Sequence, residues 1–107
     1  VSQGIEFVGD VNHPNIRLLA DFYHMVLEDE SMDVIKQTDS DVLVHTHIAR
    51  GDGRYYPLDP DEDIYRAFIR TLKDIGYKGR MSIEGRTEDV HKDGPIALNL
   101  LRELVQN

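Results

Sequence analysis

Polar side chains follow three short apolar runs of the sequence, and their types could together bind a divalent cation. They are Asp21 after residues 16–20, His47 shortly after 42–44, and Glu84 after 81–83. Two carboxylates and one imidazole form a hard, mainly oxygen donor set, which suits Mn²⁺, Mg²⁺ or Co²⁺ better than a metal that prefers thiolates. An ion in such a site can hold and polarise a carbonyl group and its neighbouring hydroxyl.

Each of these residues, taken alone, has a simpler structural explanation. An aspartate after a strand usually caps a helix or closes a turn, and a glutamate such as Glu84 could pair with the nearby Arg86. His45 and His47 are two residues apart, so on a strand both side chains point to the same face. The coincidence of three such residues at equivalent strand ends is what favours a site.

Apolar residues at helical spacing predict helices between the apolar runs. The residues that share one helical face are Ile64, Phe68, Leu72 and Ile75. The segment Asp-Pro-Asp-Glu at 59–62 is a start signal for this helix, and Gly76 is a stop. Another helix is expected to open at Asp93-Gly94-Pro95, a weaker one to cover 28–37, and one more to occupy the first dozen residues.

The alternation of strands and helices predicts an α/β fold with a parallel sheet and right-handed crossovers. The apolar runs are nearly continuous, as in strands that are covered on both faces. Because parallel strands end at the same edge of their sheet, Asp21, His47 and Glu84 are expected at one rim.

Three motifs of the chain resemble the sugar isomerase and epimerase superfamily with the xylose isomerase-like TIM barrel. They are DFYHM at 21–25, HTH at 45–47 and the strand end Ile83-Glu84. The chain is most similar to the ketose 3-epimerases (D-tagatose 3-epimerase-like) and the hydroxypyruvate isomerase-like members, over nearly its whole length. This resemblance implies that residues 1–107 are the C-terminal part of one barrel domain. They would supply about three βα units of a (β/α)₈ barrel, which needs ~250 residues in full.

The resemblance also implies a metal site. In this family a divalent ion is held by Glu, Asp, His and Glu at successive strand ends, and Asp21, His47 and Glu84 match the last three. The first glutamate would lie upstream of Val1. Mn²⁺ is the expected ion, with Mg²⁺, Co²⁺ and Zn²⁺ as alternatives. Glu84 would also be a catalytic acid/base, one of two that face opposite sides of the substrate.

Substrate contacts follow from the same resemblance. His24 matches a substrate-binding histidine, and His45 would line the same pocket. An arginine shortly after the His-x-His motif contacts substrate in the epimerases. Arg54 is the nearest match, although its spacing is one residue longer than expected, and Arg50 is the alternative. The Gly-rich stretch that follows in the family is replaced here by residues 55–60, so the sequence does not identify which sugar binds.

The implied function is that of a metal-dependent ketose isomerase or epimerase, which moves a proton next to a carbonyl through an enediolate. Its substrate would be a small sugar or hydroxy-carbonyl compound, and the three units alone would be inactive. Two alternatives remain open. One is a related barrel lyase or hydrolase, similar to inosose dehydratases or apurinic endonucleases, and the other is a non-catalytic α/β assembly module.

Composition restricts the partners of the chain. The 107 residues have a net charge of −8, which disfavours nucleic acid, and they include no cysteine, which excludes thiolate ligands and disulfides. No apolar run approaches the ~20 residues that cross a membrane, so no membrane partner is expected. The start VSQGIEF shows no secretory signal, and we predict a cytoplasmic location. Three βα units leave two strand edges unpaired, which predicts self-association through those edges.

Overall fold

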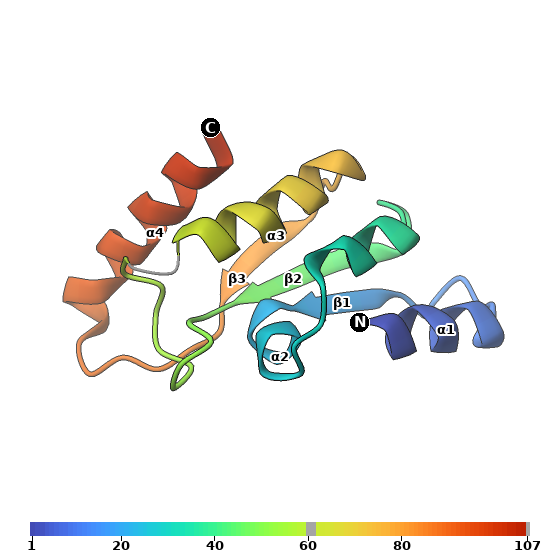
Figure 1. The fold of residues 1–107 in the computed structure, drawn as a ribbon, viewed down its shortest axis with the longest axis horizontal. Helices are drawn as coiled ribbons and strands as arrows, with labels where there is room; N and C mark the ends of the chain where they lie inside the picture. The colour runs from blue at the N-terminus through green and yellow to red at the C-terminus, as the bar shows by residue number, and fades with distance from the viewer. Residues whose placement is uncertain (60–61, 107) are drawn as a thin grey trace.

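The computed structural model describes residues 1–59 and 62–106 of the chain. The elements in chain order are α1 Ser2–Val11, β1 Leu18–Asp21, α2 Phe22–Leu27, the 3₁₀ helix η1 Met32–Gln37, β2 Leu43–Ile48, α3 Glu62–Asp74, β3 Arg80–Ile83 and α4 Val90–Gln106 (Figure 1). The strands form a parallel sheet in the order β1-β2-β3. The α/β fold with a parallel sheet is therefore confirmed.

The register of the sheet brings the three strand ends to one level. Asp21 is paired with His47, and His47 in turn with Ser82. Glu84 follows directly after β3, and its N–H donates to the carbonyl of Ile48 at 3.1 Å, which continues the pairing one residue further. The carboxyl ends of all three strands thus lie side by side.

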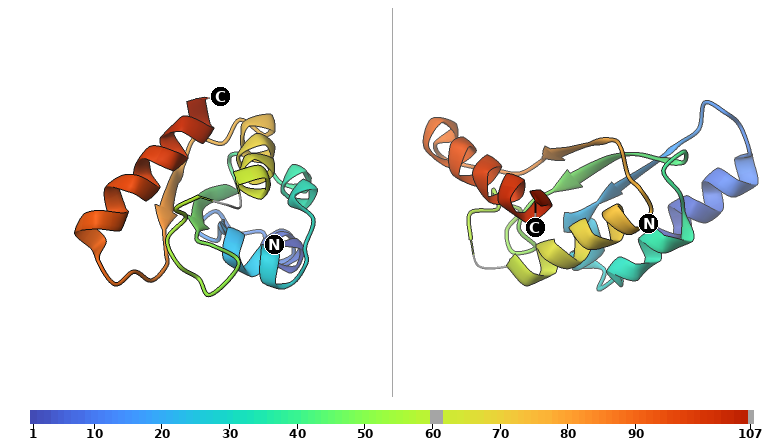
Figure 2. Two further views of the ribbon diagram at one scale, coloured as in Figure 1. Left: turned by 60° about the vertical axis from the view of Figure 1, so that its left-hand side comes forward. Right: turned by 90° about the horizontal axis from the view of Figure 1, so that it is seen from above.

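Helix α3 lies beside η1, and α4 lies beside β3 at the other edge of α3, as the two views of Figure 2 show. The core lies between these helices and the sheet, and it is built from Leu18, Ala20, Phe22, Met25, Val34, Ile35, Leu43, Ile48, Tyr65, Phe68, Ile69, Leu72, Leu101 and Leu104. On the opposite face of the sheet, Leu19 keeps 43% of its surface exposed, and His45 and His47 are only partly buried. The apolar runs predicted a sheet covered on both faces. In the described residues, only the face toward the core is covered.

The predicted stop of α3 at Gly76 is confirmed. Gly76 adopts φ 68°, a left-handed conformation that glycine reaches without steric cost. The N–H of Tyr77 donates to the carbonyl of Leu72 at 2.9 Å, which closes the helix end. Of the predicted start signal at 59–62, Pro60 and Asp61 lie outside the described residues.

Two predicted helix boundaries were wrong. Helix α4 begins at Val90 rather than at Asp93, because Asp89 caps it by accepting the N–H of Lys92 at 3.2 Å. Of the predicted helix over 28–37, only Met32–Gln37 is helical, as the 3₁₀ helix η1, and the short α2 that precedes it was not predicted. Asp29 adopts a left-handed conformation with φ 53°, which interrupts the helical backbone between α2 and η1. Ser31 then caps η1.

Among the described residues, no helix combines the length and the apolar character that crossing a membrane requires.

Candidate metal centre

Asp21 ends β1 and begins α2, and its two carboxylate oxygens have different surroundings. Oδ1 accepts the N–H groups of Tyr23 at 2.9 Å and His24 at 3.4 Å, which makes Asp21 the N-cap of α2. Oδ2 faces the neighbouring strand and lies 3.5 Å from Nδ1 of His47. The capping bonds fix the carboxylate, so that its other oxygen is held toward the rim of the sheet.

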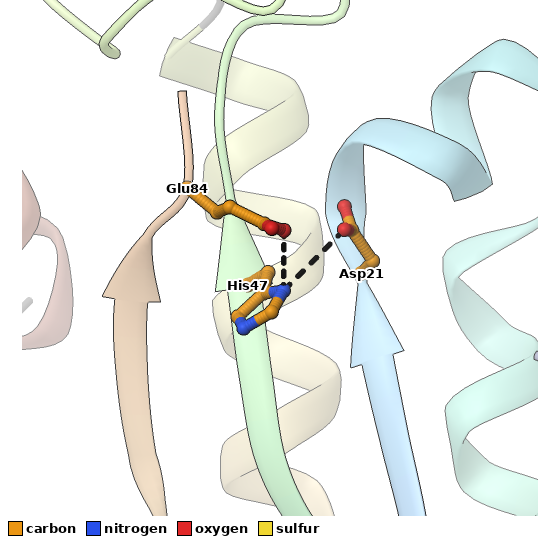
Figure 3. Close-up of side chains that lie close together, drawn as sticks. All are labelled: Asp21, His47 and Glu84. Carbon is orange, nitrogen blue, oxygen red and sulfur yellow. Dashed lines mark ion pairs between the residues drawn. The ribbon is translucent and has the colours of Figure 1, made fainter. Parts of the chain in front are cut away.

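His47 lies between the two acidic side chains, as Figure 3 shows. Its Nδ1 is 2.6 Å from Oε2 of Glu84 and 3.5 Å from Oδ2 of Asp21. The neighbouring residues Thr46 and Ile48 point to the opposite face and are fully buried, which fixes the orientation of the strand. Alternation along β2 therefore directs His47 to the open face of the sheet.

The donor atoms of Asp21, His47 and Glu84 all lie within 4.8 Å of one another. Ligands that surround a Mg²⁺-sized ion at 2.0–2.1 Å are about 3 Å apart when adjacent and about 4 Å apart when opposite. The donor types of the three residues fit a divalent cation, and Nδ1 of His47 and Oε2 of Glu84, now 2.6 Å apart in direct contact, would have to separate slightly to surround one. Asp21 is largely buried, with 13% of its side chain exposed, whereas Glu84 is 51% exposed. The site is open on the side of Glu84.

Arg54 completes the cluster, from the loop after β2. Its Nη2 lies 2.8 Å from Oε2 of Glu84 and 3.2 Å from Oδ2 of Asp21. The guanidinium carbon lies 4.8 Å from the ring centroid of Tyr23, at the distance of a cation–π contact. The guanidinium thus neutralises two carboxylates and is packed on an aromatic ring.

The backbone around Arg54 is fixed by a short pairing with the chain after β3. Arg86 donates its N–H to the carbonyl of Arg54 at 2.9 Å, and Tyr56 donates to the carbonyl of Arg86 at 3.1 Å. Arg54 itself adopts φ 59°, which is uncommon for a residue with a side chain. The loop is therefore held in one conformation that directs Arg54 toward the strand ends.

The other sequence-predicted residues take different places. His24 is exposed, and its Nε2 lies 4.0 Å from Oδ2 of Asp21. His45 shares the face of His47, with ring centroids 5.2 Å apart, and its Nε2 is 3.0 Å from Oγ of Ser82. His45 therefore lies beside the cluster, one step back along the strand.

Arg50 forms its ion pair outside the cluster. Its Nη2 lies 3.8 Å from Oδ2 of the exposed Asp52, in the same loop. Of the two arginines that the sequence left open, the structure brings Arg54 to the carboxylates.

Tyr23 and Gly85 were not predicted to belong to the site. Tyr23 supports the guanidinium, and Gly85 leaves space for the carbonyl of Arg54. The position of Tyr23, two residues after a strand-end aspartate, could have indicated that it belongs to the site. Nothing local in the sequence indicates the same for Gly85.

A profile of the xylose isomerase-like TIM barrel family matches residues 1–104 of the chain. The chain belongs to this family. The predicted membership is therefore confirmed, and it places the cluster at the end of barrel strands where family sites are expected.

Curated relatives of the chain are sugar epimerases. It is 30% identical to an L-ribulose 3-epimerase of Methylomonas sp. (strain DH-1) over 88 residues, which are 82% of this chain and 30% of the epimerase. It is 32% identical to a 3-dehydro-D-guloside 4-epimerase of Escherichia coli (strain K12) over 77 residues, 72% of this chain and 28% of that protein. A D-psicose 3-epimerase of Ruminiclostridium cellulolyticum is 32% identical over 88 residues, 77% of this chain and 27% of the epimerase.

Solved structures agree on the fold. A D-psicose 3-epimerase in the presence of D-fructose superposes with a TM-score of 0.80 at 23% identity, over 99% of this chain and 44% of that one. The D-psicose 3-epimerase with D-tagatose from Clostridium cellulolyticum H10 gives 0.75 at 23% identity, over 98% and 44%. The chain spans less than half of these structures and at most 30% of the curated relatives, so it forms part of a barrel.

Proposed function

We propose that the full-length protein containing this chain is a divalent-metal-dependent epimerase or isomerase of small sugars, and that it acts on a ketose. The observation that supports this most is the convergence of Asp21, His47 and Glu84 within 4.8 Å at the ends of adjacent parallel strands. The name of each relative identifies an epimerase that inverts a carbon next to a carbonyl group. Proton transfer inverts a carbon centre most readily at that position.

Asp21, His47 and Glu84 would hold the cation in this proposal. Two carboxylates and one imidazole suit Mn²⁺, Mg²⁺ or Co²⁺, and the family resemblance makes Mn²⁺ the ion we propose, with Zn²⁺ as a further alternative. A bound divalent ion supplies polarisation of the substrate carbonyl and of its neighbouring hydroxyl.

Glu84 is proposed as the acid/base because it is half exposed at the rim, whereas Asp21 is largely buried and also caps a helix. Its carboxylate would take the proton from the carbon next to the carbonyl, and the electron pair of that C–H bond would form the enediolate. Inversion needs a proton from the opposite face. The resemblance assigns that role to a glutamate outside this chain.

Substrate orientation is proposed for three cationic or polar side chains around the cluster. Arg54 and His24 both lie next to Asp21, and His45 lies one step along the open face. Hydrogen bonds from these groups to sugar hydroxyls would hold the reacting carbon next to Glu84. Such positioning is a major source of rate enhancement in proton-transfer enzymes.

Solvent isotope exchange tests this proposal directly. The full-length protein with Mn²⁺ is incubated with a 2-ketohexose in D₂O, and NMR follows deuterium at the carbon next to the carbonyl. We expect exchange in the wild type, and a loss of at least ~100-fold in Glu84→Gln, which is the size of a general acid–base contribution.

The matched control is Glu88→Gln, which changes an exposed glutamate four residues further on and should exchange like the wild type. Calorimetric titration of the metal-free protein with Mn²⁺ provides a second readout, and Asp21→Asn and Glu84→Gln should each weaken binding. A wild type that binds no divalent ion, or exchanges deuterium equally in Glu84→Gln, would contradict the proposal.

A further inference from the structure

Two cationic or polar nitrogens share the same pair of carboxylate oxygens in the cluster. Nδ1 of His47 and Nη2 of Arg54 both face Oδ2 of Asp21 and Oε2 of Glu84. A divalent ion held by Asp21, His47 and Glu84 would draw on the same two carboxylates, and Oδ2 of Asp21 is the oxygen that the capping bonds leave available for it. The guanidinium and the ion would therefore compete for these carboxylates.

Arg54 contacts the two carboxylates through one nitrogen only, Nη2. An arginine usually binds a carboxylate through two parallel N–H bonds, but here Nη2 alone bridges two different carboxylates. Within the described part of the chain, Nε of Arg54 is buried and has no hydrogen-bond partner. The guanidinium thus neutralises the pair without using the donor geometry that makes arginine a strong partner.

The side chain can leave the carboxylates without any change in the backbone. The peptide around Arg54 is fixed by its pairing with Arg86, whereas the side chain keeps 30% of its surface exposed. The ring of Tyr23, 4.8 Å from the guanidinium carbon, offers a surface along which the planar group can shift. A rotamer change is therefore sufficient to release both oxygens.

We propose that Arg54 is the resident counter-cation of Asp21 and Glu84, and that it competes with the divalent ion for them. This inference rests on the proposed function. Arg54 holds the two carboxylates together in the metal-free protein and gives up their oxygens when the ion binds. Because coupling between two ligands is reciprocal, a sugar that attracts Arg54 away from the carboxylates strengthens metal binding, and bound metal strengthens sugar binding.

The test measures Mn²⁺ affinity in the full-length protein after metal removal by a chelator. Titration calorimetry compares the wild type with Arg54→Gln, which keeps much of the length and removes the charge, and with Arg54→Lys, which keeps the charge. We expect Mn²⁺ to bind Arg54→Gln about tenfold more tightly than the wild type, within the usual range of couplings between sites. Arg54→Lys should stay closer to the wild type.

The matched control is Arg50→Gln, because Arg50 lies in the same loop but pairs with Asp52. It should bind Mn²⁺ like the wild type. Melting followed by circular dichroism checks that each metal-free variant is folded, and Arg54→Met replaces Arg54→Gln if the latter is not.

Equal or weaker Mn²⁺ binding by the uncharged variant, with a wild type that binds, would overturn the inference and leave the proposed function intact. A wild type and variants that all fail to bind would overturn both.

Discussion

Gly85 leaves no space for a side chain against Arg54. A methyl group added at Gly85 would lie 2.7 Å from the carbonyl oxygen of Arg54 and 3.2 Å from Cβ of Ala49. That carbonyl accepts the N–H of Arg86, so the close approach is part of the pairing that fixes the loop. The guanidinium of Arg54 thus reaches the carboxylates only because Gly85, thirty-one residues later in the chain, has no Cβ atom.

Gly85→Ala is therefore expected to displace the loop that carries Arg54. Forcing a methyl group into a filled site costs about 1–3 kcal/mol of unfolding free energy, measured by urea denaturation. The matched control is Gly9→Ala in α1, where nothing lies within 4 Å of the added methyl group. Since alanine favours helices over glycine, the control should gain about 0.5–1 kcal/mol. Equal effects of the two substitutions would contradict this account of Gly85.

Asp21 has two structural tasks that substitution can separate. Asparagine also caps helices, so in Asp21→Asn the side-chain oxygen should still accept the N–H groups of Tyr23 and His24, while the negative charge is lost. Asp21→Ala removes both and should be less stable than Asp21→Asn by about 1 kcal/mol. Urea denaturation of the metal-free protein measures this difference. The metal titration should show weakened Mn²⁺ binding in both variants, and identical stabilities would show that the cap contributes nothing.

The convergence of the three ligand candidates was predictable because it depends only on strand direction. Once three apolar runs are strands of one parallel sheet, their last residues must meet at one edge, whatever the details of their packing. Asp21, His47 and Glu84 needed no knowledge of the loops. The simpler interpretation of Asp21 as a helix cap was right, since Oδ1 accepts the N–H groups of Tyr23 and His24, and it leaves Oδ2 facing His47.

The place of Arg54 was not predictable to the same degree, because a long side chain on a loop is directed by backbone conformation. Arg50 and Arg54 are equally basic and only four residues apart. The two side chains differ in direction because Arg54 adopts a left-handed backbone conformation and its carbonyl accepts the N–H of Arg86. This pairing joins two segments that are far apart in the sequence, so no local pattern predicts it. Helix α2 was missed for a related reason. Its six residues are too few to show helical periodicity after an apolar strand.

The ring of Tyr23 is expected to support Arg54. Tyr23→Leu removes the cation–π contact and should cost about 0.5–1 kcal/mol of unfolding free energy, the range for partly exposed pairs. Tyr23→Phe keeps the aromatic face and should retain most of that stability. Urea denaturation of both variants in the metal-free protein provides the comparison. A phenylalanine variant as unstable as the leucine variant would exclude the ring as the source of the effect.

Tyr77 makes the stability of the fold sensitive to alkaline pH. Burial raises the pKa of Tyr77 above its ordinary value, and its hydroxyl donates to the carbonyl of Arg80 at 2.5 Å. Because the folded state holds the phenol neutral, this contribution is fully present below the unfolded pKa of about 10 and is lost as the pH rises through the raised folded value.

The stability difference between the wild type and Tyr77→Phe should therefore be constant between pH 7 and 9 and should fall above about pH 10. Urea denaturation at each pH measures it, and the phenylalanine variant corrects for every other group that titrates in the same range. A difference that stays constant up to pH 11.5 would contradict the assignment.

Self-association through the exposed strand edges of the sheet remains a prediction, and we expect substitutions in the groove between the edge strand β3 and helix α4 to affect it. This groove has a volume of about 380 Å³ and is lined mainly by apolar side chains, among them Met81, Ile83, Leu98, Leu101 and Val105. Leu98 and Val105 lie two turns apart on α4 and are 44% and 50% exposed, and apolar surface that lines a groove in this way is typical of an interaction site.

A polypeptide of residues 1–107 should therefore sediment as a dimer or larger species at tens of micromolar. Leu98→Lys combined with Val105→Lys should shift it toward the monomer, because the two charges would be buried at the contact without partners. The control is Val90→Lys, at an exposed valine at the far end of α4. A wild-type chain that is monomeric throughout this concentration range would contradict the prediction of self-association through the strand edges.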